Sequence, residues 1–175
     1  MNTDNWLSDV HNFSEGVAIV QINEKYNFID MEGKLLSQTW FDWCWTFHQG
    51  FGKVKLNSMY NIINNEGTFA NDDWFDGVGE FYENVACVER SNKWNYIGVD
   101  GTLLCGNWFD YCGDFVEGFG RVVLNGKLNY IGKDGKLLSD VWFDWCGVFH
   151  EGFARIRMGA KLGRIDKEGC IHDYR

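Results

Sequence analysis

The chain has 175 residues, of which 45% are apolar and 17% aromatic, and its formal net charge is −9. This apolar content excludes a disordered chain, and no apolar run approaches the roughly 20 residues that a transmembrane helix needs. The negative charge argues against general binding to nucleic acid or to an anionic membrane, because it repels polyanions. The first residues show neither the basic nor the apolar segment of a secretion signal, so we expect a cytoplasmic location.

One tryptophan recurs every 34 residues, at Trp6, Trp40, Trp74, Trp108 and Trp142. A phenylalanine and a glycine keep the same interval, at Phe13, Phe47, Phe81, Phe115 and Phe149, and at Gly33, Gly67, Gly101, Gly135 and Gly169. This register predicts a single repeat domain over residues 1–175, with units at residues 6–39, 40–73, 74–107, 108–141 and 142–175. Repeat arrays generally bind through an accumulated surface, whereas an enzyme needs one asymmetric set of catalytic groups.

The fourth unit shows the elements of one repeat most clearly. An aromatic loop begins at Trp108, and a predicted strand follows at residues 119–124. Asn125 and Gly126 predict a type I′ hairpin turn, because both tolerate a positive φ, and a second strand is predicted at residues 128–131. Gly135 then marks another turn, which leads to a predicted third strand at residues 136–138. Each unit is therefore predicted to be a three-stranded meander with an aromatic loop.

A period of 34 residues is also typical of tetratricopeptide helical hairpins. Helical units would have to accommodate several glycines each, at about 1 kcal/mol per glycine relative to alanine. The chain has 21 glycines, and apolar and other residues alternate with period two in the predicted strands. We therefore predict an all-β protein.

Alternation along the first predicted strand of each unit separates two faces. One face carries a small residue followed by two apolar ones, as in Gly120, Val122 and Leu124, and is predicted to be the core. The opposite face is basic in three units, at Lys53, Lys55, Arg121, Arg155 and Arg157. Units one and three carry Ile19, Gln21, Cys87 and Glu89 there.

Several units share the series Phe-x-Glu-Gly-x-Ala-x-Val, a short turn, Lys-aromatic-small-Tyr-Ile and then Asp/Glu-Gly-Lys, most clearly at residues 13–30, 93–98 and 149–166. This series resembles the WG (KWG) repeat family of bacterial proteins, and the resemblance covers all five units. The Trp-Gly pair that names the family is degenerate: tryptophan remains as Trp94 and glycine as Gly163, with Asn27, Asn61, Asn95 and Asn129 elsewhere. Asparagine there predicts a left-handed backbone. The resemblance implies a β-repeat fold without established catalytic residues.

Repeated meanders can stack as an open β-solenoid or superhelix, or close as a five-bladed propeller. The first and last units diverge most, as where Arg164 replaces an aromatic residue or Ile62, and such divergence is expected of capping units. We predict an open array. In the alternative ring, residues 2–5 would complete the sheet begun by residues 170–175.

Four aspartates recur in the Trp-Phe-Asp segments, at Asp42, Asp76, Asp110 and Asp144. Paired carboxylates could serve acid/base chemistry, and a hydrolase using Asp110 and Asp144 is the third of three functional hypotheses. The structural alternative is an aspartate that accepts backbone amide hydrogen bonds in a turn, and four copies favour it.

Histidine and cysteine do not form a pattern that predicts a metal site or a cofactor. His48 and His150 share one repeat position and are expected in surface loops. Cys44, Cys112 and Cys146 share another position, where Val78 stands in the third unit, which predicts small buried side chains with free thiols. No Cys-x-x-Cys pair suits zinc.

The basic stripe of Lys53, Lys55, Arg121, Arg155 and Arg157 lies near aromatic loop residues Trp43, Trp45, Tyr111 and Trp145. Guanidinium groups and stacking rings would suit an anionic, nucleotide-like ligand. The alternative is a solvated sheet face whose cations pair with the protein's own carboxylates. Our first hypothesis is a non-catalytic protein that binds a protein partner on the repeat surface. The second is a cytosolic small-molecule binder that sequesters such an anion.

Overall fold

The computed structural model describes residues 9–172, and within this range it contains only β-strands, turns and loops. The predicted all-β class is therefore confirmed. Trp6 and residues 2–5 and 173–175 lie outside the described residues. The strands fall into two compact units, one with residues up to 78 and residues 99–102, the other with residues 79–98 and residues from 103 onward. The single-domain organisation and the choice between an open array and a ring stay predictions.

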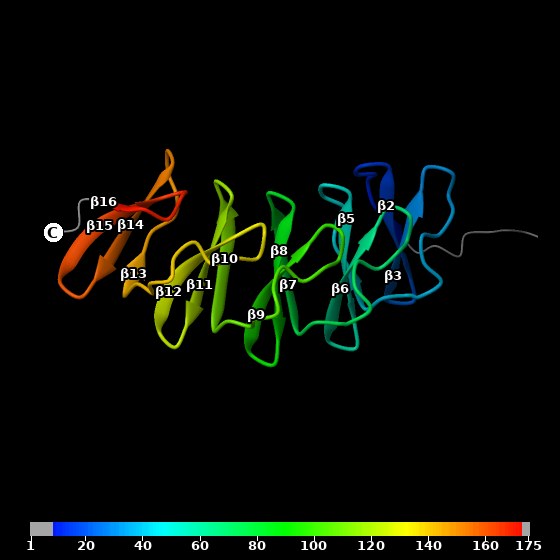
Figure 1. Cartoon of the computed structure of the whole chain (residues 1–175). Coiled ribbons are helices and arrows are strands. Elements are labelled where there is room, and N and C mark those ends of the chain that lie inside the picture. The colour runs from blue at the N-terminus through cyan, green and yellow to red at the C-terminus, as the bar shows by residue number, and fades with distance from the viewer. Residues whose placement is uncertain (1–8, 173–175) are drawn as a thin grey trace, which may run out of the picture. The chain divides into compact units, whose positions relative to one another are not determined.

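Each repeat contributes one antiparallel sheet whose strands follow one another in chain order (Figure 1). The sheets are β1 (Asp9–Val10), β2 (Val17–Ile22) and β3 (Lys25–Asp30); β4 (Trp43–Cys44), β5 (Phe51–Leu56) and β6 (Met59–Asn64); β7 (Gly77–Tyr82), β8 (Val85–Arg90) and β9 (Lys93–Gly98); β10 (Tyr111–Val116), β11 (Phe119–Leu124) and β12 (Lys127–Gly132); and β13 (Trp145–Cys146), β14 (Phe153–Met158), β15 (Lys161–Asp166) and β16 (Ile171–His172).

The hairpin between the second and third strands of each sheet forms as the sequence predicts. Asn125 and Gly126 have φ values of 52° and 74°, which are the left-handed conformations of a type I′ turn. The register of β11 on β12 follows from this turn, since Leu124 pairs with Lys127 and Gly120 with Ile131. The strands predicted at residues 119–124 and 128–131 are thus confirmed.

The predicted third strand at residues 136–138 is wrong. Leu137 makes only an isolated bridge with Ile131, and the remaining strand of the sheet is β10, which comes from the segment predicted to be an aromatic loop. A buried side chain explains the difference. The amide of Asn129 donates to the carbonyl oxygens of Ser139 and Val141, at 2.7 and 3.3 Å, and holds the chain after Leu137 in an irregular loop.

The same asparagine position corrects a second prediction. Asn27, Asn61, Asn95 and Asn129 are fully buried in strands, and none has a positive φ. The side-chain oxygen of Asn61 accepts from the next backbone N–H, and its amide donates to the carbonyls of Asn71 and Asp73. Asparagine therefore suits this position because its side chain both donates and accepts hydrogen bonds, and buried main-chain groups need such partners.

The predicted face of the second strand is buried, but in the first and third repeats the opposite face also belongs to the core, since Ile19 and Cys87 are each 7% exposed. Ala18, Val20, Val122, Ala154 and Ile156 are all buried. The small residue is required at Gly120, where a Cβ atom would lie 2.4 Å from the Tyr96 hydroxyl and 2.7 Å from the Phe115 ring. Aromatic side chains of one repeat thereby reach the sheet of the next.

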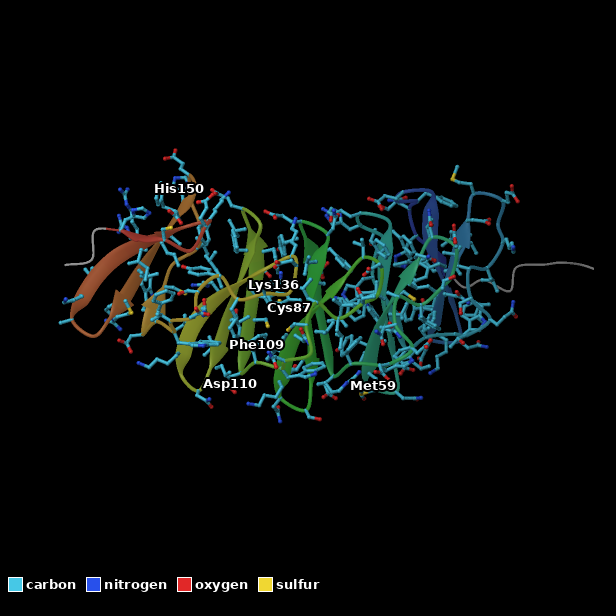
Figure 2. The ribbon with its side chains drawn as sticks, in the orientation of Figure 1. Met59, Cys87, Phe109, Asp110, Lys136 and His150 are labelled. Atoms are coloured by element: carbon cyan, nitrogen blue, oxygen red, sulfur yellow. The ribbon has the colours of Figure 1, made fainter. Side chains whose placement is uncertain are left out.

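The tryptophans of the Trp-Phe-Asp segments that lie in the described range are only half-buried, whereas the phenylalanines that follow them are fully buried. Figure 2 marks one of these phenylalanines, Phe109, and the aspartate beside it, Asp110. The backbone of Phe109 pairs with Trp94 of the preceding repeat. The phenylalanine is thus the deeper packing anchor in the second to fifth repeats.

Candidate functional site

Two of the predicted basic residues, Lys53 and Arg121, bind the adjacent repeat. The Lys53 ammonium donates to the carbonyl oxygen of Val78 at 3.3 Å, and the Arg121 guanidinium donates to that of Cys146 at 3.1 Å. Cys87 holds the same position and its thiol lies 3.6 Å from the Cys112 carbonyl. Burial raises the pKa of the Cys87 thiol to about 12. This position therefore serves the junctions between repeats.

The second repeat brings Trp43 and Lys55 together in one row across its sheet. Trp43 of β4 pairs with Lys55 of β5, which pairs with Tyr60 of β6. The Lys55 ammonium lies 5.3 Å from the centre of the Tyr60 ring, and Trp45 lies 5.9 Å from the same ring. With Asp42 and Ser58 these side chains line an open pocket of about 430 Å³. The pocket is lined by aromatic rings, by the positively charged Lys55 and by the negatively charged Asp42.

In the fourth and fifth repeats, Tyr111 and Trp145 occupy the position of Trp43. Tyr111 pairs with Val123, and Trp145 pairs with Arg157. The Tyr111 ring lies 6.3 Å from Trp94 of the preceding repeat. We call Trp43, Tyr111 and Trp145 the aromatic positions. Trp43, Tyr111 and Trp145 are 47%, 50% and 43% exposed, so they are surface groups.

Arg155 lies opposite Arg164, a residue that in the sequence indicated only that the last repeat is a capping unit. Arg155 of β14 pairs with Arg164 of β15, and Arg164 lies over the Phe153 ring at 4.6 Å. Both arginines and Trp145 line two open pockets of about 600 and 420 Å³, the larger of which also includes His150. The strand register that follows from the hairpin turn would have been enough to pair Arg155 with Arg164.

Three of the four aspartates of the Trp-Phe-Asp segments, Asp42, Asp110 and Asp144, are engaged in structural contacts. Asp110 accepts from Lys93 of the preceding repeat and from the backbone N–H of Asn125, in the hairpin turn of its own sheet. Asp42 and Asp144 repeat this pattern with Lys25 and Lys127. The lysine and the turn N–H hold the pKa of Asp110 below its usual value near 3.8. This arrangement matches the turn role predicted for these carboxylates.

Acid should therefore weaken the protein partly through these aspartates. A carboxyl group with a depressed folded pKa stabilises the fold above its unfolded pKa, and this contribution is lost as the pH falls through the folded pKa, here below about 4. We expect the urea midpoint of the wild type to fall between pH 5 and pH 3 more steeply than that of Asp110→Asn. Asp72→Asn, at an exposed aspartate, is the control and should keep the wild-type slope. Equal slopes for Asp110→Asn and the wild type would contradict this role.

The other candidate groups behave as predicted from their repeat positions. Cys44, Cys112 and Cys146 are buried, and none of the six cysteines forms a disulfide. His48 and His150 are exposed, and Figure 2 shows His150 at the surface, away from Phe109. Between residues 9 and 172 no group of three or more histidine, cysteine, aspartate or glutamate side chains could hold a metal ion. No helix in that range could span a membrane.

The fold is similar to several solved structures, all at low sequence identity. For Hsv2 of Kluyveromyces lactis with loop 6CD replaced by a Gly-Ser linker, the TM-score is 0.46 and the identity 7%, over 90% of this chain and 61% of that one. For the N-terminal domain of Nup159, the TM-score is 0.42 and the identity 9%, over 92% of this chain and 58% of that one. The chain thus spans about three fifths of these structures.

No curated protein matches the sequence. A family model described as "WG containing repeat" does match, at residues 7–26, 28–60, 75–94, 109–127 and 130–161. These five segments together make up more than half of the chain. The resemblance noted in the sequence is thereby confirmed, and the protein belongs to the WG-containing repeat family.

Proposed function

We propose that this protein is a non-catalytic binding protein that holds a protein partner on its aromatic positions. The observation that carries the proposal is the exposure of Trp43, Tyr111 and Trp145 at one repeated place in the sheets. Exposing large rings to water is unfavourable, and burying them against a partner recovers that free energy. Tryptophan and tyrosine also dominate the residues that contribute most to protein interfaces.

The surroundings of Trp43 support a protein ligand. The Trp43 ring lies 4.8 Å from Tyr26 and 6.4 Å from Trp45, so the rings form one continuous apolar surface. Lys55 and Asp42 border it and offer a donor and an acceptor. An apolar centre with a polar rim is the usual anatomy of an interface.

The absence of catalysis is part of the proposal. Its support is the use of the recurrent aspartates: Asp42, Asp110 and Asp144 are each bound to a lysine and to a backbone N–H. A general acid or base must exchange its proton with a substrate, and its pKa is usually shifted toward neutrality. The pKa values of these carboxyl groups are shifted the other way.

The proposal is tested by affinity capture from a lysate of the source cells. We expect the wild type to retain one stoichiometric protein, and the triple variant Trp43→Ala, Tyr111→Ala, Trp145→Ala to lose it. Met31→Ala, which truncates another exposed apolar side chain, is the control and should retain the partner. A photo-crosslinking residue at position 111 should become covalently joined to the same protein. If the triple variant captured the same protein as the wild type, the aromatic positions would not be the binding surface.

A second candidate function is the sequestration of an anionic, nucleotide-like ligand in the fifth repeat. The observation that favours it is the pairing of Arg155 with Arg164 beside Trp145, around pockets of about 600 and 420 Å³. Two guanidinium groups on one face can bind phosphate oxygens, and the indole ring offers a stacking plane. Lys53 and Arg121 are not part of this candidate, since they bind the adjacent repeat.

Calorimetric titration with ATP, GTP and a cyclic dinucleotide tests this second candidate. We expect at least one of them to bind the wild type and to lose about tenfold or more in affinity with Arg155→Glu. Lys136→Glu makes the same charge change at an exposed lysine of the fourth repeat and should leave the affinity unchanged. Equal affinities for the wild type and Arg155→Glu would exclude this site.

A further inference from the structure

The junctions between repeats reuse the same contacts. The repeated phenylalanine packs against an aromatic residue of the preceding repeat, with ring centres 4.9 Å apart for Phe28 and Phe47 and for Tyr96 and Phe115. At this position Phe47, Phe81, Phe115 and Phe149 are only 3–8% exposed. Each repeat therefore presents one inserting face and one receiving face.

The inserting face of the first repeat is uncovered. Phe13 is 48% exposed, although its four counterparts are buried. Val10 is 46% exposed, whereas the residues at its repeat position, Cys44, Val78, Cys112 and Cys146, are at most 9% exposed. Two apolar side chains that elsewhere belong to a junction thus face solvent here.

The receiving face of the fifth repeat is uncovered as well. The residue that receives the phenylalanine is fully buried at Phe28, Tyr96 and Tyr130, but its counterpart Arg164 is exposed. Phe153 beside it is 38% exposed. Arg155 is exposed at the position from which Lys53 and Arg121 donate to a carbonyl group of the next repeat.

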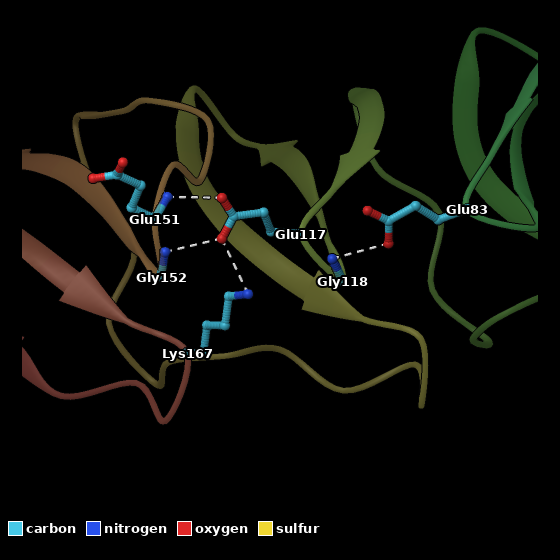
Figure 3. Close-up of polar contacts among 6 residues, drawn as sticks. All are labelled: Glu83, Glu117, Gly118, Glu151, Gly152 and Lys167. Carbon is cyan, nitrogen blue, oxygen red and sulfur yellow. Dashed lines mark hydrogen bonds and ion pairs between the residues drawn. The ribbon is translucent and has the colours of Figure 1, made fainter.

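A glutamate completes each junction by binding the turn of the next repeat. The Glu117 carboxylate accepts from the backbone N–H groups of Glu151 and Gly152, at 2.8 and 2.9 Å, and contacts Lys167 at 3.0 Å (Figure 3). Glu83 binds Gly118 in the same way, and Glu15 binds the N–H groups of Gln49 and Gly50. In Figure 3 the carboxylate of Glu151 points away from Glu117.

The turn of the first repeat has the backbone shape that these glutamates bind. Glu15 and Gly16 have φ values of 52° and 82°, and the bound turn at Gln49 and Gly50 has 53° and 82°. The N–H groups of Glu15 and Gly16 are therefore oriented to donate to a carboxylate that approaches this turn as Glu117 approaches the turn at Glu151 and Gly152.

We propose that this chain associates head to tail with a second copy of itself, the first repeat of one copy seating on the fifth repeat of the other. Phe13 packs on Phe153 and Arg164, Glu151 accepts from the N–H groups of Glu15 and Gly16, and Arg155 donates to the carbonyl of Val10. Every one of these contacts has a counterpart within the chain. Because the two faces differ, each added copy leaves both kinds of face available, and longer assemblies follow.

Arg164 makes this joint weaker than an internal one. A guanidinium group replaces the aromatic ring that receives phenylalanine at Phe28, Tyr96 and Tyr130, and a cation over a ring contributes less than a buried ring pair with its packing area. The association is thus reversible and depends on concentration. It goes beyond the proposed partner binding, because it uses the two ends of the array and leaves the aromatic positions other than Trp145 outside the joint.

Sedimentation velocity of the whole chain over a wide range of concentration tests the proposal. We expect the mass to rise with concentration for the wild type, and Phe13→Asp and Glu151→Lys each to raise the dissociation constant by about tenfold or more. Tyr82→Asp also replaces an exposed ring by aspartate, and Glu66→Lys reverses an exposed charge; both residues lie outside the two faces, and these variants should associate like the wild type. Arg164→Tyr restores the internal pattern and should tighten association.

Mixing two variants distinguishes a head-to-tail joint from a symmetric one. Phe13→Asp keeps a sound receiving face and Glu151→Lys keeps a sound inserting face, so each alone should be a monomer and the mixture should stop at twice the chain mass. A wild type that stays monomeric at every concentration would overturn the proposal. So would association that survives both variants or a mixture that gives no dimer. Circular dichroism of each variant should match the wild type, since both residues are exposed.

Discussion

Gly101→Ala should destabilise the protein by about 4 kcal/mol or more, whereas Gly33→Ala should cost only about 1 kcal/mol. The two glycines hold the same repeat position and nearly the same φ, 78° and 79°. A Cβ atom at Gly101 would lie 1.2 Å from the carbonyl oxygen of Ala70, in the preceding repeat, whereas at Gly33 it would meet nothing within 4 Å. The strain of alanine in a left-handed conformation is common to both variants. The difference between their free energies of unfolding therefore measures only the close contact between Gly101 and the preceding repeat.

Urea unfolding of the two variants measures this difference. If Gly101→Ala cost no more than Gly33→Ala, the close approach of the Gly101 turn to Ala70 would not exist in solution. Gly16→Ala is a further control, because Gly16 has a φ of 82° and open space around it. It should behave like Gly33→Ala, since neither change brings a methyl group against another repeat.

Asn61→Asp should cost about 4 kcal/mol at neutral pH, because it leaves a buried negative charge without a compensating partner. The new carboxylate would face the carbonyl oxygens of Asn71 and Asp73, to which the Asn61 amide now donates. Asn65→Asp, at an exposed residue of the same repeat, should change the stability by no more than about 0.5 kcal/mol.

The loss in Asn61→Asp should depend on pH with a defined sign. Burial raises the folded pKa of the introduced carboxyl group above its unfolded value near 3.9. Below that unfolded value the charge-related loss is absent; it grows as the pH rises and is complete above the folded pKa. The urea midpoints of Asn61→Asp and Asn65→Asp should therefore differ least near pH 3, and the difference should grow as the pH rises to 8. A constant gap would mean that position 61 is solvated.

The sequence alone predicted most of the local structure, because local structure depends on neighbouring residues. Asn125 and Gly126 adopt a positive φ at little cost wherever they occur, so the hairpin and its register follow from two letters. The alternation of Gly120, Val122 and Leu124 likewise identifies the core face within a single strand. The error at residues 136–138 arose from a contact across ten residues, that of Asn129 with Ser139, which no local pattern reveals.

The candidate site was predicted less completely. Trp43 and Tyr111 lie at the surface and Lys55 lines an open pocket, as a binding site requires, but Lys53 and Arg121 turn out to hold adjacent repeats together. Arg155 shares their repeat position and yet remains exposed. Sequence reasoning grouped these residues by charge and missed Tyr60, which the strand register brings beside Lys55.

The sequence by itself determined the period, the β-class, the hairpin turns and the identity of the repeat family. Only the tertiary structure decided which copy of a repeated residue is buried. Phe13 and Phe47 are the same residue at the same repeat position, and they differ because Phe47 has the ring of Phe28 against it. Whether a repeated side chain is buried depends on whether another repeat packs against it. The packing between repeats decides this, and the residues within a single repeat do not.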